Sequence, residues 1–436
     1  MVARSVPWVG LRARPAAPSM SRSLRGLDGL NFFVANFQTG FGPFISVYLT
    51  GVGWTQEAIG VVLSAGTVAG MVSQVPGGAV IDAVHNKRRA AAGAIIAIIA
   101  SALLIALWPA LLPMAAAEIL HAFASSMLGP AIAALSLALV GRAAFGERLG
   151  RNARYLAIGN AFAAGLMGTF GYYISDRSVF LLTAALGLPA LASLQMIRNA
   201  NAARPKLKAP SPAATATPEG AGRWWRLLRD HRLLALSACV SLFQFGNAAM
   251  LPIAAGMVTK RAGSEAQLVI AACIVAPQVV TAALSPWAGR LAERWGRRPI
   301  LLLGFSALPL RGLLFAGVAD PYLMVAIQLL DGLSAATLGV LTPLIVADVT
   351  RDTGYYTTSL GMVGLAVGTG ATLSTTAAGF MADHFGSAAA FLGLAGVGLC
   401  ATLLVWILMP ETRPPHSAAI SGASGLPDFS SSAGEP

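Results

Sequence analysis

Apolar residues run along the chain in twelve stretches of about 20 residues, separated by short segments that hold most of the charges. A helix rises about 1.5 Å per residue, so a stretch of this length crosses the roughly 30 Å hydrocarbon core of a bilayer. The pattern predicts an all-α membrane protein with twelve transmembrane helices. These helices are expected at residues 30–50, 57–81, 90–108, 113–140, 153–175, 178–197, 233–258, 266–289, 299–319, 321–347, 355–381 and 387–409.

A polar segment in the middle of the chain divides the predicted helices into two groups of six. It is rich in Pro, Ala, Thr and basic residues, a composition typical of solvated linkers. The last segment is rich in Ser, Gly and Pro and is predicted to be disordered. The predicted organisation is a basic cytoplasmic N-tail (1–27), an N-terminal six-helix bundle (28–197), a cytoplasmic linker (198–232), a C-terminal six-helix bundle (233–409) and a C-tail (410–436).

The composition and the placement of charge agree with a membrane setting. Of the 436 residues, 56% are hydrophobic and 11% are charged, whereas a soluble domain has about 25% charged residues. Lysine and arginine in the loops set the orientation of a membrane protein. If both termini are cytoplasmic, all but Arg177, Lys260, Arg261 and the span residue Arg311 fall in cytoplasmic segments. The net charge of +12 is thus explained by topology, and no nucleic-acid partner is expected.

The first 25 residues carry five arginines and no acid, and they lack the apolar core of a signal peptide. They are interpreted as a cytoplasmic tail, or partly as an overextended start, because Met20 can also initiate translation. Arginine outnumbers lysine and alanine is abundant, which is typical of a GC-rich bacterial source. The predicted location is therefore the bacterial inner membrane.

The two halves of the chain resemble each other at an offset of 210 or 211 residues. Asn36 falls on Asn247, the segment 78–82 falls on 289–293, and the segment 120–129 falls on 330–339. Three matches in the same order indicate duplication of a six-helix unit. Parallel six-helix halves around a central site are a known plan of secondary transporters.

Two loops carry a related motif of glycine, acid and basic residues. The later loop resembles the signature loop of the major facilitator superfamily, in the sequence Gly289-Arg-Leu-Ala-Glu293-Arg294-Trp-Gly296-Arg297-Arg298-Pro. The earlier copy runs Gly78-Ala-Val-Ile-Asp82-Ala83-Val-His85-Asn86-Lys87-Arg88, with Ala83 and His85 as departures from the usual arginine and glycine. Within the superfamily, the chain is similar to bacterial drug:proton antiporters. It departs from them by lacking a Gly-Pro pair in the fifth helix and by having Glu118 where a basic residue is usual.

The resemblance implies transport by alternating access, with a gate on the cytoplasmic side. The acid of each loop is expected to accept hydrogen bonds from a neighbouring helix end or arginine, which holds that side shut. The alternative is a solvated loop in which the basic residues only fix topology. The gate residues implied are Gly78, Asp82, Lys87, Arg88, Gly289, Glu293, Arg294, Gly296 and Arg297.

Ionisable residues inside the predicted spans are the sharpest functional signal. A charge at the membrane centre costs roughly 2.5–3.5 kcal/mol on insertion scales, so such groups face a cavity or pair with one another. Glu118 and His121 are three residues apart and share one helix face. The repeat gives Gln328 and Asp331 the equivalent positions, and the resemblance implies that these two helices face each other across a central cavity.

These residues lead to a hypothesis about coupling. Carboxyl and imidazole groups can both take up and release protons, so Glu118, His121 and Asp331 are candidates for the proton-coupling or substrate-binding site. Alternatively, Glu118 and His121 satisfy each other within the bundle. Arg311 is expected away from the cavity, as a structural pair or with its head group at the interface. Amides of the first and seventh helices are expected either to face the cavity or to pack between helices; they are Asn31, Asn36, Gln38, Gln244 and Asn247.

Nothing in the sequence predicts catalysis or a cofactor. It has no phosphate-binding loop with Walker spacing, no histidine pair at metal spacing, and no paired cysteines. The leading prediction is a monomeric secondary transporter that exports small organic molecules, driven by the proton gradient. The alternatives are a proton symporter or uniporter for a small charged metabolite, and a non-transporting receptor or scaffold in which Glu118, His121 and Asp331 can be changed without consequence.

Overall fold

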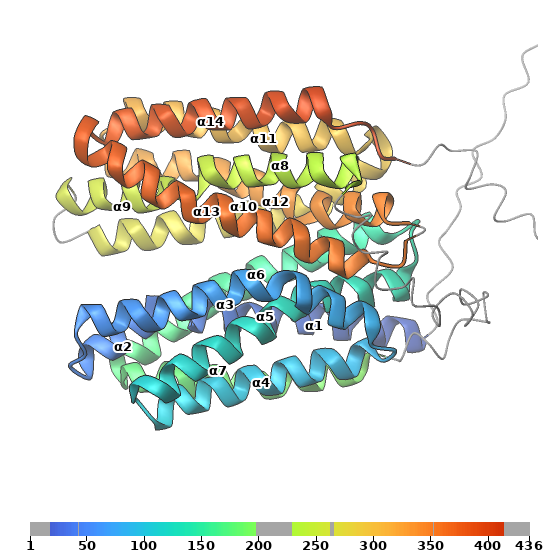
Figure 1. Cartoon of the computed structure of the whole chain (residues 1–436), viewed down its shortest axis with the longest axis horizontal. Coiled ribbons are helices and arrows are strands. Elements are labelled where there is room, and N and C mark those ends of the chain that lie inside the picture. Colours follow the sequence, from blue (N-terminus) through green and yellow to red (C-terminus); the bar gives the residue numbers. More distant parts are fainter. Residues whose placement is uncertain (1–17, 42, 198–228, 262–265, 352, 414–436) are drawn as a thin grey trace, which may run out of the picture.

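The computed structural model describes residues 18–41, 43–197, 229–261, 266–351 and 353–413. Within them it contains fourteen α-helices and no strand. Figure 1 shows these helices in two halves, with α1 to α7 in one half and α8 to α14 in the other. Residues 1–17 of the predicted N-tail, most of the predicted linker and residues 414–436 of the predicted C-tail lie outside the described residues.

The N-terminal half provides six membrane spans. Its first span is made of two helices, and each of the other five is a single helix. The helices are α1 (Pro18–Gly40), α2 (Pro43–Gly51), α3 (Gln56–Ala83), α4 (Lys87–Leu107), α5 (Leu111–Val140), α6 (Phe145–Tyr173) and α7 (Asp176–Met196).

The C-terminal half repeats this plan span by span. Its first span is again two helices, and α4 and α11, the third spans of the two halves, have the same length of 21 residues. The helices are α8 (His231–Asn247), α9 (Met250–Arg261), α10 (Ala266–Trp295), α11 (Arg297–Gly317), α12 (Pro321–Val349), α13 (Tyr356–Phe385) and α14 (Ser387–Leu408). The predicted duplication and the twelve-helix architecture are therefore confirmed.

The first and seventh spans were predicted as continuous helices, and both are interrupted in the structure. Helix α2 begins at Pro43, whose missing N–H cannot continue the backbone hydrogen bonds of α1. Between α8 and α9 the N–H of Ala249 donates to the Ser374 hydroxyl of α13 at 3.1 Å, outside its own helix. Apolar periodicity cannot reveal such breaks, because both segments remain apolar across them.

Two helices begin eight or more residues earlier than predicted. Helix α1 starts at Pro18 rather than residue 30, and α6 starts at Phe145 rather than residue 153. Both early segments carry charges, which made them resemble a tail and a loop. Ten candidate spans satisfy the criteria of length and apolar composition among the described residues, with the span of α1 and α2 and the helix α6 as the two exceptions.

Each half has its own apolar core, and the two halves meet mainly at two pairs of helices. The N-terminal core lies among α1 to α5 and α7, while the C-terminal core also takes in Phe145 and Leu149 from α6. Helix α3 packs against α13, and α6 packs against α10. The end of the bundle where α1 begins and α14 ends, at the right of Figure 1, carries most of the described arginines and is called the basic end below.

Candidate functional site

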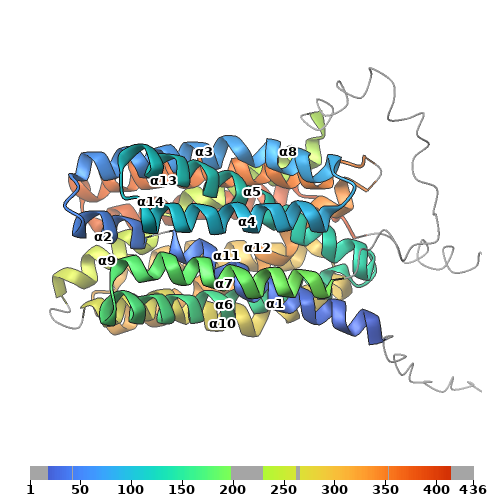
Figure 2. The same cartoon turned by 90° about the horizontal axis from the view of Figure 1, so that it is seen from below.

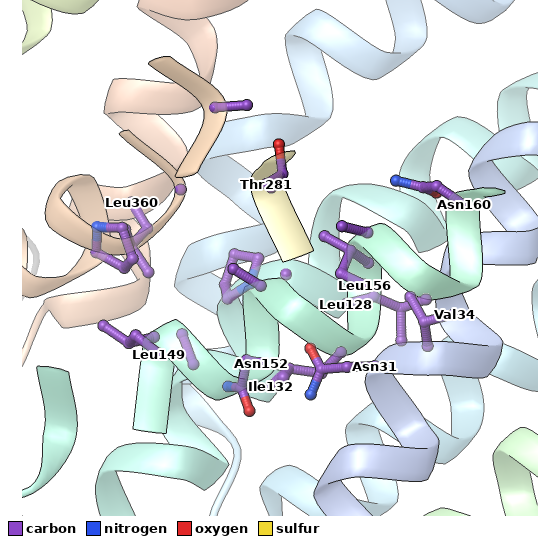
Figure 3. A pocket seen from close by; sticks show the side chains of 18 of the residues that line it. Asn31, Val34, Leu128, Ile132, Leu149, Asn152, Leu156, Asn160, Thr281 and Leu360 are labelled. Atoms are coloured by element: carbon purple, nitrogen blue, oxygen red, sulfur yellow. The ribbon is translucent and has the colours of Figure 1, made fainter. Parts of the chain in front are cut away.

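A central cavity has two adjoining chambers, which share Gln74, Ser125, Gly129 and Pro130. The inner chamber is lined by both halves, and the outer chamber is lined by residues of the N-terminal half. The inner chamber, nearer the basic end, has a volume of about 470 Å³. Figure 3 shows its lining, to which the C-terminal half contributes Thr281 and Leu360. The N-terminal half contributes apolar side chains and amides; those labelled in the figure are Asn31, Val34, Leu128, Ile132, Leu149, Asn152, Leu156 and Asn160.

The outer chamber, with a volume of about 670 Å³, contains the ionisable pair predicted on the fourth span. Glu118 and His121 both line it, as their shared helix face predicts. Neither chamber's described lining includes a lysine or arginine. Among the described side chains, Glu118 and His121 are therefore the ionisable groups of the cavity wall.

Glu118 is buried and incompletely bonded. Its residue is 6% exposed, and its Oε1 atom has no hydrogen-bond partner among the described residues. The carboxyl group lies close against α3 at Gly66, where an added Cβ would come within 2.5 Å of Glu118 Oε2. The absence of a side chain at Gly66 leaves the space that the carboxyl group occupies. The alternative in which Glu118 and His121 bond to each other is not observed.

His121 has different partners. Its imidazole stacks on the Phe41 ring with the two centroids 3.6 Å apart and the planes 7° apart. Its Nε2 atom lies 3.0 Å from the Ser125 hydroxyl. Phe41 belongs to the interruption between α1 and α2, so His121 links the fourth span to the broken part of the first.

Asp331 lies in a different environment from the one predicted. It forms an ion pair with Arg311, and Arg311 also donates to the Asn247 side chain. Two further contacts of 3.3 Å join the Arg311 Nε and Nη2 atoms to the Met250 sulfur. The structural pairing expected for Arg311 is confirmed, but no contact joins Asp331 to Glu118 or His121 in the described part of the chain. Asp331 also lines neither chamber, whereas Glu118 and His121 line the outer one.

The amide residues predicted to face the cavity lie in different places in the structure. Asn31 lines the inner chamber and donates to the Leu27 carbonyl at 2.7 Å. Asn36 is fully buried and donates to carbonyls of its own helix at 3.1 and 3.3 Å. Gln244 accepts from Asn247 at 3.2 Å, and the buried Gln328 has an Oε1 atom without a described partner. Asn36, Gln244 and Gln328 line neither chamber, and the side chain of Gln38 lies outside the described part of the structure.

The first copy of the loop motif closes the basic end between α3 and α13. Asp82 accepts from the Thr357 N–H at 3.1 Å, from the Thr358 N–H at 2.7 Å and from the Thr358 hydroxyl at 2.8 Å. These are the first N–H groups of α13, where a carboxylate is favoured by unpaired donors and by the helix dipole. A Cβ on Gly78 would lie 2.2 Å from the Thr357 carbonyl oxygen, so the two helices touch only because residue 78 is glycine.

The second copy closes the basic end between α6 and α10 by a different set of contacts. A Cβ on Gly289 would lie 2.2 Å from the Gly146 carbonyl oxygen, so the helix backbones are in close contact here as well. Glu293, however, pairs with Arg297 at 3.2 Å, and Arg297 also pairs with Asp348 at 3.0 Å. The equivalent acids therefore bond differently, Asp82 across the halves and Glu293 within its own half.

The remaining predicted gate residues hold neighbouring segments. Lys87 Nζ donates to the Ile81 carbonyl at 2.9 Å, and Arg88 Nη1 donates to the Ile197 carbonyl at 3.0 Å. Gly296 has a φ of 105°, a conformation that favours glycine. Arg294 is exposed, and its carbonyl accepts from Arg413 at 2.6 Å.

One partly buried ion cluster was missed from the sequence. Asp28 of α1 pairs with Arg148 at 2.7 Å and with Arg151 at 2.5 Å, both from α6. Arg148 Nε also donates to Asn152 at 2.7 Å, and Asn152 donates to the Ser136 hydroxyl at 2.8 Å. The cluster fixes Asn152 in the wall of the inner chamber. Had α1 and α6 been extended to their true starts, the three charges would have appeared inside membrane spans.

Among the described residues, no group of three or more His, Cys, Asp or Glu side chains is placed to hold a metal ion.

Comparison with known proteins places the chain in a family. The model of the Major Facilitator Superfamily matches residues 27–276 and 236–432. An uncharacterized MFS-type transporter of Mycobacterium tuberculosis, found in two strains, is 37% identical over 396 residues, which are 90% of this chain and 94% of the relative.

Solved structures share the fold. The human organic anion transporter TETRAN is 14% identical with a TM-score of 0.69, covering 89% of this chain and 100% of its own. The proton:xylose symporter XylE is 14% identical with a TM-score of 0.68, covering 91% of this chain and 96% of its own.

Proposed function

The chain belongs to the major facilitator superfamily, and on that premise we propose that it exports small, largely apolar organic molecules in exchange for protons. It is a membrane transporter, and members of this family work by alternating access. The proposal concerns what is carried, in which direction, and by what coupling group. It rests chiefly on one observation: the buried Glu118 carboxyl has an unpartnered oxygen on the wall of the central cavity.

Glu118 suits the role of proton carrier because its surroundings do not neutralise a negative charge. In the described structure no lysine, arginine or histidine forms an ion pair with it. An unpaired carboxylate is costly to bury, whereas the neutral carboxylic acid is not. A cationic substrate beside Glu118 favours release of the proton, and its departure favours uptake. Substrate and proton then compete for one site, which is what exchange of a substrate for a proton requires.

Asp331 is the weaker candidate for this role. Its charge is already balanced by Arg311, which is 2% exposed. Neutralising Asp331 would leave a buried guanidinium without a counter-ion, a state that is strongly unfavourable. We therefore assign coupling to Glu118, with His121 as its neighbour on the cavity wall, and a structural role to Asp331.

The cavity lining supports the substrate class. The inner chamber is lined by apolar side chains such as Phe37, Leu128 and Ile132, with a few amides between them. Pockets of this kind bind organic molecules by apolar contact and orient them by a few hydrogen bonds. Because the ionisable lining consists of Glu118 and His121, a neutral or cationic substrate is favoured over an anion.

The direction follows from the proposed orientation. The basic end is assigned to the cytoplasm of a bacterial inner membrane because lysine and arginine concentrate on that side. The contacts between halves described above all lie toward the basic end, at residues 78–82 with 357–358 and 146 with 289. We assign this arrangement to an outward-open state of a monomer, since one chain encloses the cavity. A Glu118 that is reached from outside can collect the incoming proton.

A transport assay in proteoliposomes tests the proposal. Vesicles containing an internal pH dye are exposed to a library of neutral and cationic organic compounds. We expect alkalinisation inside when a substrate enters, and loss of that signal in Glu118→Gln. Glu147→Gln removes an exposed carboxyl of α6 outside the cavity lining and is the matched control.

The other functions give different results in the same assay. Internal acidification on substrate entry would indicate a symporter. Substrate counterflow without proton movement would indicate a uniporter. Silence in both measurements, with the folded protein present in the vesicles, would favour a receptor or scaffold. Each of these results would overturn proton-coupled export.

A further inference from the structure

A second cavity lies on the outer surface of the N-terminal half, between α4 and α7 at the basic end. It has a volume of about 430 Å³. The two helices pack against each other on the face shown nearest the viewer in Figure 2. The polar part of its lining includes Arg88, Arg89 and Gln195, and the apolar part includes Ala92, Ile96 and Leu191.

The arginines stand at the membrane edge of this cavity. Arg88 is partly buried and uses Nη1 to donate to the Ile197 carbonyl at the end of α7. Arg89 is exposed on the next position of α4. Both belong to the first turn of α4, whose N-terminus adds a partial positive charge. The cavity therefore presents a site of positive charge without an acidic lining residue.

The C-terminal half shows what occupies the equivalent place there. Helix α11 begins at Arg297, 210 residues after the start of α4 at Lys87. The N–H groups of Arg297 and Arg298 donate to the Glu411 carboxylate at 2.8 and 3.2 Å. The start of α11 thus binds an anion, which is supplied by the segment after α14.

The N-terminal half has no such acid in its sequence. The equivalent segment follows α7, and no aspartate or glutamate occurs between Ile197 and Pro218. It contains instead the basic residues Arg198, Arg204, Lys206 and Lys208. We propose that the cavity between α4 and α7 binds an anionic phospholipid, whose phosphate takes the place that Glu411 takes in the other half.

The apolar part of the cavity favours binding of a lipid over binding of a free anion. Ala92, Ile96 and Leu191 continue from the arginines toward the middle of the membrane, and the Ile96 side chain is 55% exposed on a membrane span. Basic pockets between transmembrane helices on the cytoplasmic side bind anionic lipid head groups, while acyl chains lie along apolar helix faces. The basic part of the groove thus matches the phosphate head group of a phospholipid, and the apolar part matches its acyl chains.

Lipid binding to the purified full-length protein tests this site. Native mass spectrometry in detergent would compare phosphatidylglycerol, phosphatidylcholine and inorganic phosphate as probes. We expect selective binding of phosphatidylglycerol, weakened about fivefold by Arg89→Gln and about thirty-fold by Arg88→Gln with Arg89→Gln, since each basic residue near the surface contributes about 1 kcal/mol. Arg89→Gln alone leaves the hydrogen bond from Arg88 to the Ile197 carbonyl in place. Weaker lipid binding by this variant is therefore not explained by misfolding.

The controls separate the site from general charge attraction. Arg22→Gln with Arg25→Gln removes two exposed arginines of α1 at the same end and is expected to leave binding unchanged. Ala92→Phe fills the apolar part of the groove and is expected to weaken phosphatidylglycerol binding. Three results would overturn the proposal. They are equal binding of the two lipids, a loss of phosphatidylglycerol binding in the α1 control as large as in the Arg88 and Arg89 variant, and binding of inorganic phosphate as tight as that of phosphatidylglycerol.

Discussion

The two halves share one plan, but the ionisable residues of their fourth spans are bonded differently. In the C-terminal half, Arg311 and Asp331 balance each other, and Arg311 also holds Asn247 at the end of α8. In the N-terminal half, the residue equivalent to Asp331 is His121, which stacks on Phe41. Glu118 there has an oxygen without a partner.

The difference indicates which ionisable residues of the duplicated fold stabilise its structure and which are available for function. A satisfied ion pair is costly to disturb, so it holds one arrangement of the spans that it joins. An unsatisfied carboxyl beside a cavity can change its charge as the cavity changes its contents. We therefore infer that the Arg311–Asp331 pair holds its spans in one arrangement and that Glu118, in the N-terminal half, is the group that responds to protons.

The largest expected effect comes from breaking the C-terminal pair. Asp331→Asn leaves the Arg311 guanidinium buried without a counter-ion and is expected to lower the free energy of unfolding by about 3–5 kcal/mol. Denaturant unfolding in detergent measures this change. Glu118→Gln removes no ion pair and is expected to change the unfolding free energy by less than about 1 kcal/mol.

A double replacement sharpens the same comparison. Arg311→Met together with Asp331→Leu removes both charges at once and is expected to restore most of the lost stability, because a buried ion pair replaced by apolar residues is often neutral. A double variant as unstable as Asp331→Asn would show that the pair contributes more than mutual neutralisation.

The second effect concerns the two closures at the basic end. Asp82→Ala removes bonds to three donors on α13, and a hydrogen bond to a charged group contributes about 1.5–3 kcal/mol. Glu293→Ala removes a pair within one half only. The reporter is Leu156→Cys, which places a thiol in the inner chamber of a Cys400→Ser protein. We expect a thiol reagent added on the basic side to react faster with this cysteine when Asp82→Ala is also present than when it is absent. Faster reaction in Glu293→Ala than in Asp82→Ala would contradict the assignment of the main closure to Asp82.

The smallest expected effect is at the aromatic stack. Phe41→Leu removes the ring that lies on His121, and an aromatic pair contributes about 0.5–1.5 kcal/mol. Substrate affinity is expected to fall by about two- to tenfold while proton exchange per substrate is retained. Loss of coupling in this variant would move the coupling role from Glu118 toward His121.

The architecture could be predicted from the sequence because its signals are local. The twelve apolar runs and the loop motif need only neighbouring residues to be recognised, and the repeat needs only a comparison of the sequence with itself. The face shared by Glu118 and His121 was predictable for the same reason, since residues three apart lie side by side on a helix.

The bonding of the candidate site could not be predicted in the same way. Asp331 and Arg311 lie on different helices, and their meeting depends on how α11 packs against α12. The cluster of Asp28, Arg148 and Arg151 was missed because charges in the first turns of α1 and α6 resemble loop residues. Likewise, Asp82 and Glu293 lie in similar sequence motifs but have different neighbours in space. Only the fold therefore reveals that their bonding partners differ.

The most direct test of the account compares two kinds of transport in Glu118→Gln. Proteoliposomes would be assayed for exchange of labelled against unlabelled substrate, and separately for accumulation driven by a proton gradient. The account predicts that exchange persists, because the cavity and both closures are intact, while gradient-driven accumulation falls to the level of empty vesicles. Gradient-driven accumulation at the rate of the unaltered protein would contradict the assignment of proton coupling to Glu118.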